Sequence, residues 1–300
     1  MKFATASVRG GLAAMGAAAL LALPGPAQAS EVRVTAAPPA GAYWHTRTLI
    51  KETSPRQVGK GANRYWLVEQ VLIEEWGTPD GRFWVGSRVP GAYPSSAADR
   101  VAWRRDGSPA KWTRTADGQV VDLSTKPSHG HVTPVRGRNS FSLAGQKLTY
   151  DEVQRLPANP KALKSWLMEA GRVSRMPENE LDRFVTQTLP DLFRRLPAPK
   201  EVRAAAYQAL LTMPGVQSRG TAKDGMGRAG AVLRIEDPPQ VVRKETDRLR
   251  TDLIVDTGTM LLLSESQTST INGKATDKPS TEIVLQAGWT NAGPAVPALP

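Results

Sequence analysis

The sequence predicts an α+β fold: a strongly bent, half-barrel-like antiparallel sheet with about three helices inserted mid-chain and packed on one face. Strand-like segments occupy residues 42–150 and 215–289, and residues 151–214 between them have the apolar spacing of amphipathic helices. Because such helices must bury one face, and the predicted sheet is the only large apolar partner, we expect a single domain over residues 42–289.

The first 29 residues have the features of a secretory signal peptide. Lys2 and Arg9 give a charged start, an apolar stretch covers residues 10–23, and Ala27-Gln28-Ala29 is a small-x-small cleavage site. The apolar stretch is shorter than the about 20 residues that span a bilayer. We therefore expect cleavage after Ala29 and a secreted, extracytoplasmic protein. Retention of this segment as an N-terminal anchor is the alternative.

Two segments that flank the predicted domain, residues 30–41 and 290–300, are rich in Ala and Pro. Neither has the alternating apolar side chains of a strand or the 3.6-residue spacing of a helix. We expect a disordered linker and a disordered tail.

The composition excludes several classes of function. The chain has no cysteine, which excludes disulfides, thiolate metal sites and a Cys nucleophile. The formal net charge is +11, but the basic residues are scattered, with small groups such as Arg104-Arg105 and Arg194-Arg195, and are not interleaved with aromatic residues. We therefore expect no nucleic-acid partner. Weak attraction to anionic cell-wall polymer or phospholipid headgroups is the alternative to an ordinary basic surface.

The first half of the predicted sheet contains a strand at residues 43–50 and a long β-hairpin at residues 63–89. At the hairpin turn, Pro79 presets φ and Asp80-Gly81 tolerates positive φ. Further short strands are predicted at residues 101–105 and 110–115. Residues 90–99 have a loop composition, and residues 116–139 are turn-like.

The register of the hairpin follows from its turn. A type I turn with Gly81 as the bulge residue places Trp76 opposite Trp84 and Glu74 opposite Gly86. A two-residue loop would shift the register by one and break the aromatic pair. We favour the bulged version, in which the Trp pair contributes up to about 1 kcal/mol.

The middle of the chain predicts three helical regions after a short turn at residues 151–156. Asn159-Pro160 has the chemistry of an N-cap followed by Pro at the first helical position. A second region starts near Pro177 and is kinked or restarted at Pro190. The third runs over residues 199–213 and ends at Pro214-Gly215. Strands return at residues 216–221, 229–236, 249–255, 260–270 and 282–287.

One motif resembles a catalytic signature. Asp256-Thr257-Gly258-Thr259 follows three apolar residues, as in aspartic proteases. That chemistry needs two aspartates that share one proton, and the sequence has one copy of the motif. We therefore expect a strand–turn–strand there, with an aspartyl hydrolase at Asp256 as the least favoured alternative.

Other motifs lack the context that their chemistry requires. His129-Gly130-His131 does not have zinc-site spacing, so we expect an ordinary loop and no metal. The glycines at residues 225–230 lie between strands and not before a helix, which predicts a hairpin loop and no dinucleotide cofactor. Glu74 and Glu75 face opposite sides of a strand, so we expect solvated charges. No catalytic residues and no cofactor are predicted.

The eight Trp residues leave two interpretations open. They are either core and edge aromatics of a β protein, or the walls of an apolar groove for an acyl chain, glycan or peptide. The residues predicted to line such a groove are Trp44, Trp66, Trp76, Trp84 and Trp166.

Several short motifs resemble an uncharacterised family of actinobacterial exported or membrane-anchored proteins. They are Glu75-Trp76 with Asp80-Gly81, the helix start Leu156-Pro157-Ala158-Asn159-Pro160, the stretch Met213-Pro214-Gly215-Val216, and Gly227-Arg228-Ala229-Gly230. The resemblance covers residues 43–265 and implies no assigned activity. The order of elements also resembles, more loosely, the half-barrel of LolA-like periplasmic lipoprotein carriers and envelope sensors, which implies binding of acyl chains between sheet and helices.

The leading functional prediction is a secreted, non-enzymatic envelope protein. It would bind an apolar or amphipathic ligand, such as a lipid or acyl chain, between the Trp-rich sheet and the helices. The alternative is a structural or regulatory interaction domain that binds an envelope protein.

Overall fold

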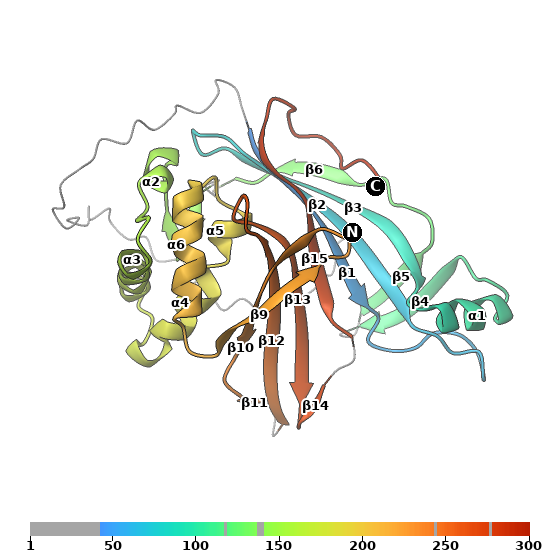
Figure 1. The fold of residues 1–300 in the computed structure, drawn as a ribbon. Coiled ribbons are helices and arrows are strands. Elements are labelled where there is room, and N and C mark those ends of the chain that lie inside the picture. Colours follow the sequence, from blue (N-terminus) through green and yellow to red (C-terminus); the bar gives the residue numbers. More distant parts are fainter. Residues whose placement is uncertain (1–42, 117–118, 137–140, 243–244, 276–277) are drawn as a thin grey trace. The chain divides into compact units, whose positions relative to one another are not determined.

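The computed structural model describes residues 43–116, 119–136, 141–242, 245–275 and 278–300 (Figure 1). The chain divides into two compact units, 1–36 and 37–300, and every described residue belongs to the second unit. The predicted signal peptide and linker lie outside the described residues. No helix in the described part of the chain is long and apolar enough to cross a membrane.

The second unit is built on one open, curved antiparallel sheet, which confirms the predicted fold class (Figure 1). The strand order is β6 (His131–Pro134), β3 (Phe83–Pro94), β2 (Leu67–Gly77), β1 (Tyr43–Thr53), β15 (Ser280–Thr290), β13 (Leu261–Ile271), β12 (Glu245–Asp256), β10 (Ala229–Glu236) and β9 (Val216–Lys223). Two short strands, β11 (Gln240–Val242) and β14 (Lys274–Ala275), pair with β12 and β13. The first and last thirds of the chain meet where β1 pairs with β15.

The β2–β3 hairpin has the predicted turn and register. Gly81 has a φ of +91°, its N–H donates to the Thr78 carbonyl at 2.9 Å, and the Thr78 N–H donates to the Arg82 carbonyl at 2.9 Å. Trp76 pairs with Trp84, and Glu74 pairs with Gly86. The prediction of a bulged turn is therefore confirmed.

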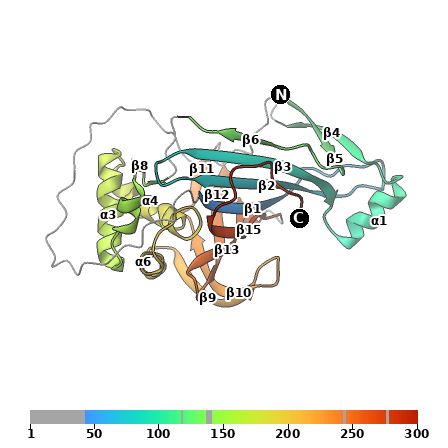
Figure 2. The same cartoon turned by 90° about the horizontal axis from the view of Figure 1, so that it is seen from above.

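The helical insert begins with α2 (Tyr150–Gln154) and α3 (Pro160–Val173). Asn159 caps α3 as predicted, because its Oδ1 accepts the Ala162 N–H at 3.0 Å. The second predicted region is divided at Pro190 into a 3₁₀ turn (Glu178–Glu180), α4 (Leu181–Thr188) and α5 (Asp191–Arg194), and α6 (Lys200–Leu211) is the third. These helices lie at one end of the strands, and α1 (Ala97–Arg105) lies at the other end (Figure 2).

Three predictions for residues 90–147 were wrong. The strand expected at 101–105 is part of α1, because Ser96 accepts the Asp99 N–H at 3.0 Å and starts a helix two residues after β3 ends. The loop expected at 90–99 is partly the end of β3. The turn-like stretch after 116 contains β5 (Gln119–Ser124), which pairs with the predicted strand β4 (Lys111–Ala116), and also β6. A small hairpin of β7 (Ser142–Leu143) and β8 (Gln146–Lys147) precedes α2.

The two faces of the sheet have different coverings. On the helix face, Trp44, Leu253 and Val284 belong to the same buried cluster as Leu167, Phe193 and other side chains of the helices. Successive side chains of a strand point to opposite faces. Since Trp44 pairs with Gly77, the neighbouring Trp76 lies on the other face.

That other face, here called the tail face, carries Leu72, Trp76 and the segment 291–300. The segment was expected to be disordered, but it runs back beside β3 and β6 (Figure 1). Pro297 is buried, and the Ala298 carbonyl accepts a hydrogen bond from Arg47 Nη2 at 2.6 Å. The local composition could not reveal this order, because the contacts that hold the segment come from distant residues. Arg47 and Arg88 are 251 and 209 positions away from the residues that they bind.

Candidate functional site

The structure does not bring the five predicted groove residues together. Trp44 is 8 % exposed and packs edge-on against Trp289, with ring centroids 5.7 Å apart. Trp166, on α3, is partly buried against the same cluster. These two side chains therefore belong to the core between the helices and the sheet.

The other three lie elsewhere. Trp76 is 3 % exposed on the tail face and stacks on His45 at 4.9 Å between ring centroids, and Trp84 packs edge-on against Tyr43 at 5.8 Å. Trp66 lines a separate open pocket of about 390 Å³, with Lys51 among its neighbours. The prediction of one groove lined by all five Trp residues is therefore wrong, because the alternation of side chains along β1 and β2 places Trp44 and Trp76 on opposite faces.

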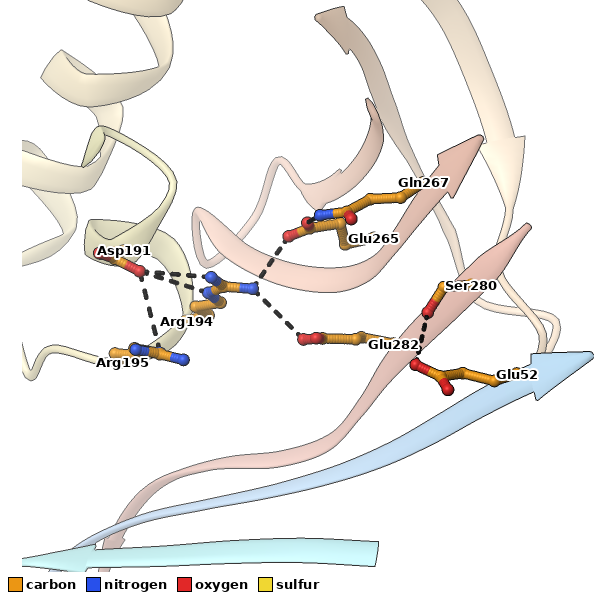
Figure 3. Close-up of polar contacts among 8 residues, drawn as sticks. All are labelled: Glu52, Asp191, Arg194, Arg195, Glu265, Gln267, Ser280 and Glu282. Atoms are coloured by element: carbon orange, nitrogen blue, oxygen red, sulfur yellow. Dashed lines mark hydrogen bonds and ion pairs between the residues drawn. The ribbon is translucent and has the colours of Figure 1, made fainter. Parts of the chain in front are cut away.

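A polar cluster on the helix face is the better candidate, and Figure 3 shows it. Glu265 on β13 and Glu282 on β15 are direct cross-strand partners. Arg194 of α5 reaches between them, and its Nη1 donates to Glu265 Oε2 at 3.0 Å and to Glu282 Oε2 at 3.3 Å. The same guanidinium also donates to Asp191 Oδ1 at 3.4 Å.

The local sequence explains how α5 places Arg194. Pro190 separates α5 from α4, and Asp191 lies in the first turn, where a negative charge is favoured by the helix dipole. Leu192 and Phe193 are fully buried and fix the short helix against the core. Arg194 is then directed to the strands.

The electrostatics of the cluster are those of charges taken partly out of water. Burial raises the pKa of Glu282 above its ordinary 4.5; Arg194 opposes this rise, whereas Glu265 and Glu75 add like-charge repulsion. Burial lowers the pKa of Arg194, but Glu265, Asp191 and Glu282 outweigh burial and raise it. Arg194 therefore stays charged and stabilises the adjacent carboxylates of Glu265 and Glu282 on the helix face.

Next to this cluster lies a cavity of about 140 Å³ between sheet and helices, here called the helix-face cavity. Its apolar walls include Trp44, Phe83, Phe141 and Leu196, and its polar lining includes Glu75, Asp191 and Arg195. The buried Nε1–H of Trp44 has no hydrogen-bond partner among the described residues. The carboxylate of Glu75, which is half-buried, has no hydrogen-bond or ion-pair partner among them either. Such groups favour a ligand that supplies the missing partner.

The charged groups that line the cavity are Glu75, Asp191 and Arg195. Their sum is −1 when all are ionised, whereas the whole chain has a formal net charge of +11. The cavity lining is thus slightly acidic on a basic protein.

Sequence reasoning missed this cluster. Arg194-Arg195 was treated as one of the scattered basic pairs, although Arg194 follows the apolar face of a predicted helix. Glu74 and Glu75 were expected to be solvated. They do face opposite sides, but Glu74 is only 6 % exposed and accepts a hydrogen bond from His45 Nε2 at 2.8 Å. Carboxylates inside the predicted strands were the available signal.

The remaining sequence motifs lie in turns or at the starts of strands. Asp256 Oδ1 accepts the Gly258 N–H at 2.9 Å and Oδ2 accepts the Thr259 hydroxyl at 2.6 Å, so its carboxylate is engaged in the β12–β13 turn. Residues 225–230 form the β9–β10 turn and the start of β10, as predicted. No group of three or more potential metal ligands occurs within the described ranges.

Comparison with known proteins adds little. No protein-family model matches the chain, and no curated protein matches it. A solved β-barrel-like protein of a domain of unknown function from Brucella abortus aligns over 83 % of this chain and 99 % of that chain, at 8 % identity and a TM-score of 0.20. A lipovitellin structure on lipid–protein interactions aligns over 86 % of this chain, at 9 % identity and a TM-score of 0.18.

This chain spans 26 % of the length of the lipovitellin chain. TM-scores of this size carry no argument about function. The resemblance of this chain to LolA-like carriers stays a prediction.

Proposed function

We propose that this protein binds a small amphipathic ligand with a cationic group, and that the helix-face cavity is its site. The carrying observation is the carboxylate of Glu75, which lines a cavity with aromatic walls and has no partner in the part of the chain that the structure describes. The protein acts as a binding protein and not as an enzyme, in an extracytoplasmic compartment, as its signal-peptide pattern predicts.

The volume of the cavity limits the apolar part of the ligand. A cavity of about 150 Å³ accommodates a benzene ring, and the helix-face cavity has about 140 Å³. It therefore takes one ring or a short aliphatic group. A lipid would insert only one end of its chain, which narrows the acyl-chain prediction made from the sequence.

The charges select the polar part of the ligand. An ammonium group at the mouth of the cavity would meet Glu75 and Asp191, both of which line it. Arg195 lines the cavity as well and pairs with Asp191 at 3.9 Å, so the net charge of −1 left for a ligand is that of Glu75. Charge-assisted hydrogen bonds of this kind are about twice as strong as neutral ones.

Isothermal titration calorimetry with three probes of similar size tests the proposal: phenethylammonium, 2-phenylethanol and 3-phenylpropionate. We expect the cation to bind best, by about tenfold or about 1.4 kcal/mol. Glu75→Gln should remove that preference, and Ser142→Trp, which adds a large side chain at the cavity lining, should block all three probes. Glu201→Gln, at an exposed position on α6, is the matched control.

Two results would overturn the proposal. One is equal affinity for the cation and the neutral alcohol. The other is binding that persists unchanged in Ser142→Trp, since the ligand would then lie elsewhere.

A further inference from the structure

The tail face carries a bound proline-rich segment. Residues 291–300 end in Gly-Pro-Ala-Val-Pro-Ala-Leu-Pro, and Pro297 is the buried residue of this segment. Val296 and Leu299 are 43 % and 39 % exposed, so the segment does not add its largest apolar side chains to the core. The contact therefore depends on Pro297 and on the backbone of the segment.

Two glycines shape the surface under the segment. A Cβ at Gly86 would lie 3.1 Å from Pro297 Cδ, 3.1 Å from Trp76 Cζ3 and 3.2 Å from the Ala295 carbonyl oxygen. A Cβ at Gly130 would lie 2.8 Å from Val296 Cγ1. The missing side chain at Gly86 leaves room for the Pro297 ring beside Trp76, and the missing side chain at Gly130 leaves room for Val296.

Two arginines bind the backbone of the segment. Arg88 Nη1 donates to the Pro297 carbonyl at 3.1 Å, and Arg47 Nη2 donates to the Ala298 carbonyl at 2.6 Å. Both are held in place, because Arg88 Nε donates to the Ser128 carbonyl at 3.0 Å and Arg47 pairs with Glu74 at 3.5 Å. Donors aimed at carbonyls suit a proline-rich strand, which lacks N–H groups for a sheet ladder.

The spacing of the prolines fits this mode of contact. Pro294, Pro297 and Pro300 recur every third residue, which is the period of a polyproline II helix. Of the three, Pro297 is buried, Pro294 is half-buried and Pro300 is exposed. Grooves lined by aromatic residues recognise such Pro-x-x-Pro segments in other proteins. Trp76, Trp84 and Tyr43 are the aromatic side chains available on this face.

We propose that the tail face is a recognition site for extended segments with Pro-x-x-Pro spacing, and that residues 291–300 occupy it in cis. This site is on the opposite face of the sheet from the helix-face cavity and goes beyond the proposed ligand-binding function. A short tether after β15 gives the cis segment an effective concentration in the millimolar range. Another proline-rich segment therefore binds only when the chain's own segment has been displaced.

The test uses a variant truncated after Thr290 and a synthetic peptide of residues 290–300 added in trans. Calorimetry should show one-to-one binding to the truncated variant and at least about tenfold weaker binding to the full chain. A peptide with alanine in place of the three prolines should not bind. In the truncated variant, Gly86→Val and Arg88→Ala should abolish binding, whereas Arg219→Ala, at an exposed position on β9, should not change it.

A folded truncated variant that ignores the peptide, or that binds the alanine peptide equally well, overturns the proposal. If truncation prevents folding, the full chain supplies the answer. Arg47→Ala with Arg88→Ala should then make residues 291–300 at least about tenfold more susceptible to proteolysis at unchanged circular dichroism. Unchanged protection of the segment would refute the recognition site.

Discussion

Glu265 and Glu282 lie directly opposite each other on β13 and β15, and one guanidinium, that of Arg194, donates to both. Like charges in this cross-strand position destabilise a sheet when nothing lies between them. The insert of helices thus contributes more than apolar cover, because its shortest helix, α5, neutralises a repulsive pair on the strands.

Replacing Arg194 by Met should be strongly destabilising. Removal of the cation leaves Glu265, which is 6 % exposed, beside Glu282 without the guanidinium that bonds to both. Breaking a buried ion pair from one side typically costs about 3 kcal/mol. We expect urea denaturation to show a loss of about this size, and the neighbouring Arg195→Met, whose side chain is 48 % exposed, to lose less than about 1 kcal/mol. Equal losses would show that the two carboxylates do not depend on Arg194.

The raised pKa of Glu282 predicts that this residue contributes stability at low pH and loses that contribution as the pH rises. The folded state holds this proton more tightly than the unfolded chain, in which the pKa is near 4.5. The associated stability is present below 4.5 and is lost as the pH rises through the folded pKa. As the pH rises from 4.5 through the folded pKa, the free energy of unfolding of the wild type should therefore fall relative to that of Glu282→Gln. Above the folded pKa, the difference between the two should stay constant. Urea midpoints measured across this pH range are the test, and a flat difference for Glu282→Gln would contradict the assignment.

Asp224 should show the opposite pH dependence. Burial raises its pKa, but hydrogen bonds from Arg228 and from the N–H groups of Arg228 and Met226 outweigh burial and lower the pKa below 3.8. The stability contributed by this carboxylate is then present above 3.8 and is lost as the pH falls through the lower folded value.

Asp224→Asn should thus cost about 3 kcal/mol at about pH 7, and the cost should shrink in acid. Arg228 also donates to the Leu263 and Val284 carbonyls at 3.1 and 2.7 Å, so this one turn ties β9–β10 to β13 and β15. Thermal unfolding followed from neutral to acidic pH is the measurement. A cost that grows in acid would refute the assigned shift.

Local chemistry predicted the elements whose cause is local. The β2–β3 register followed from Pro79, Asp80 and Gly81, and the start of α3 followed from Asn159 and Pro160. Helix α1 was missed because its nine residues bury no side chain, so no apolar periodicity marks it. Its cap at Ser96 was the available signal.

The site could not be predicted in the same way, since its causes are long-range. Arg194 is 71 residues from Glu265 and 88 from Glu282 in sequence, and only the pairing of β13 with β15 brings the carboxylates together. The predicted Trp groove failed for a related reason. Trp residues suit either face of a pleated sheet, and the sequence does not say which face the helices will cover.

A last prediction separates the turn at Asp256 from catalysis. Thr259 and the Gly258 N–H lower the pKa of this carboxylate below 3.8, and no second aspartate is bonded to it among the described residues. The hydrolase chemistry needs two aspartates that share a proton, and Asp256 has no such partner among the described residues. Asp256→Asn should therefore lower stability by about 1 kcal/mol through the weakened turn and leave ligand binding at the helix-face cavity unchanged. Peptide cleavage by the wild type that is sensitive to pepstatin and absent from Asp256→Asn would show instead that the aspartate is catalytic.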